Sequence, residues 1–107
     1  MGASKSESFS VSHNEMATIF KALSHPARVA IVEYLLLAES CICGDIVNEL
    51  PLAQPTVSQH LKELKNANII KGTIEGTAIC YCINPEIICR IEHYFSAISK
   101  QLQNKCC

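Results

Sequence analysis

One stretch of the chain, residues 54–66, restricts the possible folds more than any other. It reads Q-P-T-V-S-Q-H-L-K-E-L-K-N, and its proline suits the first turn of a helix, where the missing N–H costs no hydrogen bond. Val57, Leu61 and Leu64 recur at i, i+4 and i+7, which is the spacing of one helical face. The stretch therefore predicts an amphipathic helix whose apolar face is directed into a core.

The opposite face of this predicted helix is polar and carries little charge. Such side chains can exchange hydrogen bonds with base edges while a lysine contacts a phosphate. An ordinary solvated face has the same composition, so the surrounding segments must decide between the two interpretations. The candidate DNA-contacting residues on this face and its flanks are Gln54, Thr56, Ser58, Gln59, Lys62 and Lys65.

Two helices are predicted earlier in the chain. Ser12 and Glu15 have the spacing of a capping box and begin a short amphipathic helix. A second helix starts at Pro26 and runs to about residue 38, with Arg28 near its start pointing outwards. This second helix is nearly all apolar, which predicts a central position; the residues expected to face inwards include Val29, Val32 and Leu36.

A short third helix at 45–50, followed by a tight turn and the helix at 54–66, makes a helix-turn-helix. After residue 68 the apolar period changes from 3.6 to 2, and residues 70–75 and 79–83 predict two strands of a β-hairpin. A hairpin directly after a helix-turn-helix is a wing. Cys80 and Cys82 alternate with apolar residues on its second strand, which favours packing over metal binding.

Asn84 and Pro85 predict the start of a last helix with one long apolar side. That side consists of Ile87, Ile88, Ile91, Phe95, Ile98 and Leu102. A chain of 107 residues forms a single small domain, which leaves this helix little to cover. We therefore expect its apolar side to bury against a partner subunit.

Composition limits the remaining classes. The net charge of −1 is mild evidence against nucleic-acid binding by the chain as a whole, although not by one face of it. Seven cysteines, an odd number, argue against a secreted disulfide framework and favour reduced thiols in the cytoplasm. No apolar run approaches the ~20 residues of a membrane helix. Residues 1–11 are expected to be a flexible leader, and 12–107 the folded domain.

Four stretches resemble the ArsR/SmtB-type winged-helix metalloregulators, and together with the last helix the resemblance covers residues 13 to about 103. They are F-K-A-L-S-H-P-A-R at 20–28, C-I-C-G-D at 41–45, Q-P-T-V-S-Q-H-L-K-E-L at 54–64 and I-C-Y-C-I at 79–83. The resemblance implies a mainly α winged helix-turn-helix (αααα-ββ-α) that forms a homodimer through its first and last helices. It implies a repressor of operator double-stranded DNA, released by an inducer, with no enzymatic activity.

The resemblance also bears on the inducer. Zinc-sensing members carry ligands on the last helix, and the positions that correspond here are Pro85, Ile87, Ile98 and Gln101, none of which can serve. Arsenic-sensing members carry a Cys-x-Cys pair at the start of the third helix, where this chain has Cys41 and Cys43. Thiolates select soft ions. Two sulfurs at this spacing lie on the same side only if the backbone is extended there or if the start of the helix is distorted.

Arsenite and antimonite require a third sulfur. Some arsenic sensors place it three residues after the pair, where this chain has Ile46, so it must come from elsewhere. Cys106 and Cys107 are the first candidates; Cys89, which the apolar pattern of its helix otherwise assigns to the core, is the alternative. The predicted inducer is arsenite, antimonite or a soft divalent metal ion, and its predicted ligands are Cys41, Cys43, Cys106 and Cys107.

Two other functions remain open. A thiol redox or reactive-sulfur sensing repressor would have the same fold, but such family members place a cysteine late in the second helix, where Glu33 stands. A small cysteine-based metal-binding protein or thiol enzyme would leave the polar face at 54–66 and the wing unexplained. The sequence contains no recognisable nucleophile–base–orienter set, and His25 and His60 are expected to have structural roles.

Overall fold

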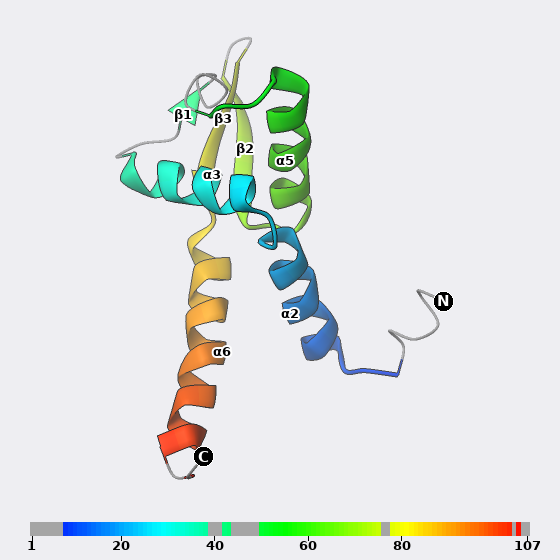
Figure 1. Ribbon diagram of the computed structural model, residues 1–107, viewed down its shortest axis with the longest axis vertical. Coiled ribbons are helices and arrows are strands. Elements are labelled where there is room, and N and C mark those ends of the chain that lie inside the picture. Colours follow the sequence, from blue (N-terminus) through cyan, green and yellow to red (C-terminus); the bar gives the residue numbers. More distant parts are fainter. Residues whose placement is uncertain (1–7, 39–41, 44–49, 76–77, 104, 106–107) are drawn as a thin grey trace.

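The computed structural model describes residues 8–38, 42–43, 50–75, 78–103 and 105 (Figure 1). The predicted mainly helical winged helix-turn-helix is confirmed. The expected third helix at 45–50 lies almost entirely outside the described residues. The described elements are α2 (Val11–Ala22), α3 (Pro26–Leu37), β1 (Ile42–Cys43), α5 (Gln54–Asn66), β2 (Ile70–Glu75), β3 (Ala78–Ile83) and α6 (Pro85–Gln103).

These elements form a head and two extended helices. In Figure 1, α3, α5 and the three strands make up the head, and α2 and α6 extend from it in the same general direction. None of the described helices combines the length and apolar character that a bilayer span requires.

The first two helices begin with side-chain caps. Ser10 caps α2, and its Oγ accepts a hydrogen bond from the His13 N–H at 3.0 Å. The capping box predicted at Ser12 is therefore wrong, because Glu15 forms an ion pair with Arg90 of α6 instead of turning back to the helix start. His25 caps α3 through its Nδ1, which accepts from the Ala27 N–H at 3.0 Å.

The core forms where the apolar stripe of α5 meets α3 and the start of the hairpin. Val57 and Leu64 are fully buried, as is Ile31 of α3. Each such side chain stabilises the fold by about 1.5–3 kcal/mol relative to exposure. The other core residues are Met16, Ile19, Ala22, Leu35, Leu61, Ala67, Ile69, Ile70 and Ile87.

The predicted inward face of α3 is partly wrong. Val29 and Leu36 are 43% and 64% exposed, and the buried line of α3 instead passes through Ile31 and Leu35. A helix that is apolar nearly all round has no single hydrophobic face, so its sequence does not reveal which side meets the core.

A buried asparagine connects the end of α5 to the start of α6. Asn68 has φ +61°, a left-handed conformation that this residue type tolerates, and it ends α5 so that the Ile69 N–H donates to the Leu64 carbonyl at 3.0 Å. Asn84 Nδ2 donates to the Asn68 carbonyl at 2.9 Å, and Asn84 Oδ1 accepts from the Glu86 N–H at 3.1 Å. The predicted start of α6 is thus confirmed.

The sheet contains the predicted hairpin and one strand that was not predicted. The order is β1-β3-β2, with both pairs antiparallel. In the hairpin, Ile70 pairs with Ile83 and Gly72 with Tyr81. On the other edge of β3, β1 places Ile42 opposite Tyr81. Two residues are too short to show any period, so only their pairing with β3 identifies them as a strand.

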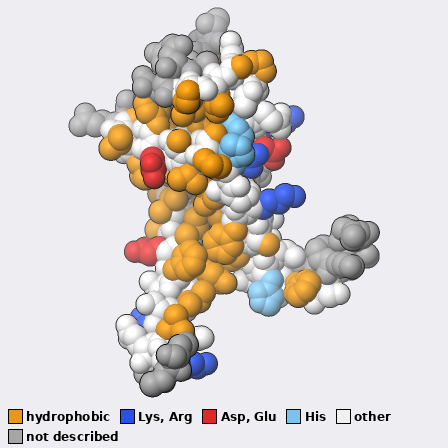
Figure 2. Space-filling model, in the orientation of Figure 1, with side chains coloured by type: hydrophobic (Ala, Val, Ile, Leu, Met, Phe, Trp, Pro, Cys, Tyr) orange, Lys and Arg blue, Asp and Glu red, His pale blue; other side chains and the backbone are white. Residues whose placement is uncertain are grey.

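Most of the apolar side of α6 is not covered by the other described residues. Figure 2 shows hydrophobic side chains continuing from the head along α6. Those of the helix that are more than a third exposed are Ile88, Tyr94, Phe95, Ile98 and Leu102. Cys89, expected in the core, is exposed as well.

Candidate DNA interface and cysteine positions

The polar face of α5 lies on the outer side of the head. In Figure 1, α5 runs along one margin of the head with β2 beside it. Its apolar stripe is buried, as predicted, whereas all six candidate DNA-contacting side chains are exposed: Gln54, Thr56, Ser58, Gln59, Lys62 and Lys65. The helix therefore presents a continuous polar surface to solvent next to the wing.

One side chain on this surface is held in place by a neighbour. Gln59 Nε2 donates a hydrogen bond to Glu63 Oε2 at 3.0 Å, across one turn of the helix. A glutamine amide has a second N–H and a carbonyl oxygen, and both remain available to a base edge. The contact reduces the freedom of the Gln59 side chain before any DNA arrives.

Lys65 extends from α5 towards the hairpin. A Cβ at Gly72 of β2 would lie 3.5 Å from Lys65 Nζ and 3.3 Å from Tyr81 Cε1. Glycine at this position therefore leaves room for the ammonium group between the helix and the wing. Lys62 is exposed on α5 and Lys71 on β2, so three positive charges border the polar face.

A buried histidine anchors α5 to α3 and, through Arg28, to α2. His60 is 7% exposed, and its Nδ1 accepts a hydrogen bond from Arg28 Nε at 3.0 Å. Arg28 Nη1 also donates to the Ala22 carbonyl at the end of α2, at 3.3 Å. The ring of His25 lies 4.4 Å from that of His60, centroid to centroid. The predicted structural roles of both histidines are confirmed.

The sequence predicts that Arg28 points outwards, and this prediction is wrong. Arg28 is half-buried, because the Ala22 carbonyl at the end of α2 and the Nδ1 of His60 offer acceptors that no sequence pattern shows. Burial lowers the pKa of His60 from 6.5, and the nearby His25 and Arg28 lower it further. His60 is thus held in its neutral form, which keeps the lone pair on Nδ1 that Arg28 requires.

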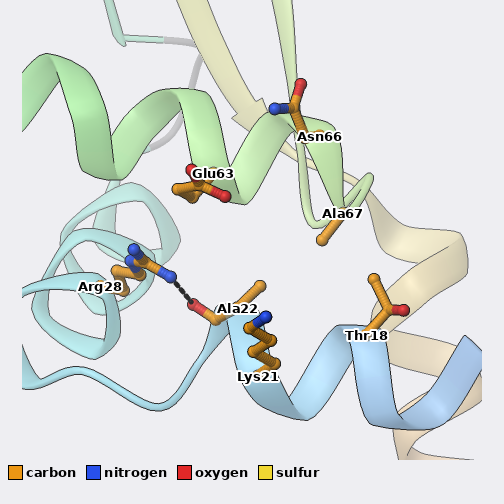
Figure 3. Close-up of a pocket in the computed structure, with 7 residues that line it drawn as sticks. All are labelled: Thr18, Lys21, Ala22, Arg28, Glu63, Asn66 and Ala67. Carbon is orange, nitrogen blue, oxygen red and sulfur yellow. Dashed lines mark hydrogen bonds between the residues drawn. The ribbon is translucent and has the colours of Figure 1, made fainter. Parts of the chain in front are cut away.

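A hollow lies beside this anchor (Figure 3). Thr18 and Lys21 enter it from α2, Arg28 from α3, and Glu63 and Asn66 from α5. Both signs of charge line the hollow, so its walls select neither an anion nor a cation. Its position between α2, α3 and α5 fits a gap where three helices pack better than a ligand site.

The structure describes only some of the predicted metal ligands. Cys43 lies in β1, so the backbone there is extended, as chelation by a Cys-x-Cys pair requires. Cys41, Cys106 and Cys107 lie outside the described residues. Among the described residues, no three His, Cys, Asp or Glu side chains gather closely enough to hold a metal ion.

The wing cysteines differ from what the composition predicts. Cys80 is 1% exposed, in agreement with the packing role expected for it, and Cys82 is half-buried. Both are disulfide-bonded in the structure, whereas reduced thiols were expected. Odd cysteine number and overall composition describe the compartment of a protein, and they do not show which sulfurs the fold brings into contact.

Comparisons with known proteins agree with this architecture. Residues 25–71, which span α3 to the start of β2, match the family described as bacterial regulatory protein, arsR family. The chain is 31% identical over 97 residues to the arsenical resistance operon repressor of Staphylococcus xylosus, covering 91% of this chain and 92% of that protein. It is 40% identical over 73 residues to the cadmium resistance transcriptional regulatory protein CadC homolog of Staphylococcus aureus, covering 67% and 60% respectively.

A solved structure shows the same fold. The crystal structure of an ArsR family transcriptional regulator superposes with a TM-score of 0.76 at 18% identity, and the match covers 87% of this chain and 95% of that one. The sequence match along nearly the whole chain and the shared fold lead to one conclusion: this chain belongs to the arsR family of bacterial regulatory proteins, which are helix-turn-helix transcriptional regulators and not enzymes.

Proposed function

We propose that this protein is a repressor that binds operator double-stranded DNA as a homodimer and is released when arsenite, antimonite or a soft divalent metal ion binds its cysteine thiolates. The observation that carries the proposal is the two-sided character of α5. Its apolar stripe is buried in the core, and its short polar side chains are exposed beside a wing. The names of two relatives, one of arsenical and one of cadmium resistance, support the class of inducer.

The polar face of α5 has the chemistry that a recognition helix needs. A major groove is wide enough for one α-helix, and an amide side chain such as that of Gln59 suits the N6 and N7 edge of adenine. Thr56 and Ser58 can donate to or accept from either base or phosphate. Lys62 and Lys65 supply the positive charge that phosphates require, which explains how a chain of net charge −1 can bind DNA.

The uncovered side of α6 supports a dimer with a second copy of this chain. Phe20 of α2 contacts Tyr94 and Phe95 of α6, with ring centroids 5.7 and 5.8 Å away, so α2 and α6 form one apolar surface. If a two-fold axis passes through this surface, the dimer presents two α5 helices. These would enter successive major grooves, which lie about 34 Å apart on one side of the DNA. A helix-turn-helix protein reads both half-sites of an operator only as such a pair.

Thiolate ligation supports release of DNA. Moving a two-state equilibrium from 1:99 to 99:1 requires about 5.5 kcal/mol of differential affinity. Several bonds between thiolates and a thiophilic ion can supply this much, whereas a weak surface site cannot. Cys41 and Cys43 stand immediately before the segment that leads into α5, so an ion held there would act on the position of the recognition helix.

The test is a fluorescence anisotropy titration of the reduced protein on a fragment of its own promoter. Arsenite, antimonite and cadmium are then added in turn. Wild-type protein should bind the fragment and release it with at least one of the three, and Cys43→Ser should bind equally well but release it poorly. Cys89→Ser, a change at an exposed cysteine on α6, is the matched control and should respond like wild type. Release of Cys43→Ser at the wild-type inducer concentration would refute the assignment of this cysteine.

The disulfide bonding of Cys80 and Cys82 favours a second candidate, a repressor that responds to thiol oxidation. The same assay separates the two when diamide, a thiol oxidant, replaces the metal ion. Release by diamide, reversed by dithiothreitol, with no release by arsenite, antimonite or cadmium would favour this second function over the first.

A further inference from the structure

The face of the β-hairpin that lies towards α5 runs from the core out to solvent. At its inner end Ile70 pairs with Ile83, and Ile70 is buried. Further out, Ile74 pairs with Ile79 on the same side of the hairpin, because side chains alternate along each strand. Ile74 is 79% exposed and Ile79 is 44% exposed, although both side chains are large and apolar. The described residues thus leave Ile74 and Ile79, which we call the wing pair, largely uncovered.

The ammonium group of Lys65 lies next to the wing pair. A Cβ at Gly72, between the two isoleucine pairs, would lie 3.5 Å from Lys65 Nζ and 3.4 Å from Ile79 Cγ2. Lys65 of α5 and Ile79 of β3 therefore border the same space above Gly72. Since glycine has no side chain, this space between the helix and the hairpin stays open. A positive charge and an apolar surface are thus presented side by side.

This combination matches the chemistry of one strand of DNA, along which charged phosphates alternate with deoxyribose rings that have apolar faces. The major groove is about 12 Å wide, and a helix with its side chains is about 10–12 Å across. A DNA strand that borders the groove must therefore pass directly beside a helix bound in it. The hairpin lies directly beside α5 (Figure 1).

We propose that the wing pair packs against deoxyribose rings of the operator strand that passes between α5 and the hairpin, while Lys65 contacts a phosphate of the same strand. The inference rests on the proposed function, which places α5 in the major groove. It extends the DNA-binding surface from α5 to the hairpin. Because the sugar is the same in all four nucleotides, the wing pair contributes affinity and position without a preference for sequence.

Charge favours DNA over a second copy of this chain as the occupant of this surface. Lys62 and Lys65 are exposed on α5, and Lys71 is exposed on β2. They outnumber the one carboxylate whose position the structure describes on these two elements, that of Glu63. Two copies that met here would bring like charges together, at a cost in Coulomb energy, whereas DNA phosphates neutralise these charges.

The test measures the affinity of variants for a fragment of the protein's own promoter and for scrambled DNA, by fluorescence anisotropy at several salt concentrations. In Ile74→Thr/Ile79→Thr, threonine keeps the branched shape that suits a strand and removes apolar carbons. Affinity for both DNAs should fall about 4–16-fold, the effect of losing one to two buried CH2 groups. The slope of log affinity against log salt concentration should not change, because no charge is removed. Lys65→Ala should instead reduce that slope by about 1.

Leu37→Thr is the matched control. It makes the same kind of change at an apolar side chain that is 85% exposed. Leu37 is the last residue of α3, whose C-terminal end lies on the side of the head away from α5 (Figure 1). This variant should bind both DNAs as the wild type does.

A second measurement follows the isoleucine methyl groups of the wild-type protein by NMR, so that it does not depend on the folding of a variant. Addition of scrambled DNA should shift the methyl signals of Ile74 and Ile79. The signal of Ile98, on α6, should not move. If Ile74→Thr/Ile79→Thr unfolds, as its circular dichroism spectrum would show, these shifts decide alone.

Several results would overturn the inference. Unchanged affinity of the folded double variant, or methyl signals of the wing pair that do not move, would exclude a contact with DNA. Loss of affinity for the promoter fragment alone would mean that the wing pair reads bases. A change in the sedimentation of the DNA-free protein would mean that the wing pair joins copies of this chain. In each case the proposed function stands if Gln59→Ala still weakens operator binding, and it fails if the wild type does not bind the promoter fragment.

Discussion

The anchor between Arg28 and His60 provides the sharpest prediction about stability. Arg28→Met keeps the apolar stem of the side chain but removes its donors to His60 Nδ1 and to the Ala22 carbonyl. A hydrogen bond that involves a charged group contributes about 1.5–3 kcal/mol, and the buried His60 would be left without this partner. We therefore expect the free energy of unfolding to fall by about 1.5–3 kcal/mol.

The measurement is urea denaturation followed by circular dichroism. Wild type and variant must be compared at one protein concentration, because stability of a dimer depends on it. Lys21→Met is the matched control: it removes a positive charge that lines the same hollow, from a side chain that is exposed. A change of less than about 0.5 kcal/mol for Arg28→Met, the usual range of surface substitutions, would refute the anchor.

The same anchor predicts how stability depends on pH. Because the pKa of His60 is lowered on folding from 6.5, the unfolded chain binds its proton more readily than the folded one. This contribution to stability is therefore complete above pH 6.5 and is lost as pH falls from 6.5 through the lower pKa of the folded state. In His60→Gln, the urea midpoint should depend less on pH across that window than it does in the wild type. The same dependence on pH in both proteins would contradict the assignment.

The remaining predictions concern DNA and the dimer. Gln59→Ala should weaken operator binding by about 1–3 kcal/mol and relax base specificity, measured by anisotropy against operator and scrambled DNA. Lys62→Ala should weaken binding to operator and to scrambled DNA alike, and it should reduce the slope of log affinity against log salt concentration by about 1. If both variants bind DNA as the wild type does, another face of the protein reads DNA. Phe95→Glu should convert a dimer into a monomer in sedimentation velocity, whereas Gln101→Glu, with the same added charge on the same helix, should not. A wild-type monomer at micromolar concentration would refute the dimer.

The elements that were predicted correctly come from sequence segments in which one pattern dominates. Residues 54–66 carry one apolar stripe, one polar face and an early proline, and α5 has those bounds. The change to a period of two after Asn68 identified both hairpin strands. Asn84 before Pro85 identified the start of α6. Where periodicity, capping and turn residues all agree, local sequence is enough to define an element.

The errors arise where tertiary contacts choose among equal local options. Ser10 and Ser12 are both possible caps of α2, and the ion pair of Glu15 with Arg90 removes the partner that would favour Ser12. Arg28 looks like a surface residue until the end of α2 and His60 are placed beside it. β1 exists only through its pairing with β3.

The connections of β3 indicate how an inducer bound at the proposed ligand Cys43, on the strand that pairs with β3, would release DNA. Asn84, directly after β3, donates to the carbonyl of Asn68, just beyond the end of α5, and its Oδ1 accepts from the Glu86 N–H at the start of α6. Both groups of this buried amide are engaged, so we expect a shift of β3 to be transmitted to the end of α5 and to the start of α6. The inducer would then change the angle between the two α5 helices of the proposed dimer while each helix stays folded. Two intact recognition helices that no longer match major grooves about 34 Å apart would lose operator affinity, so the far-ultraviolet circular dichroism should stay constant while DNA is released.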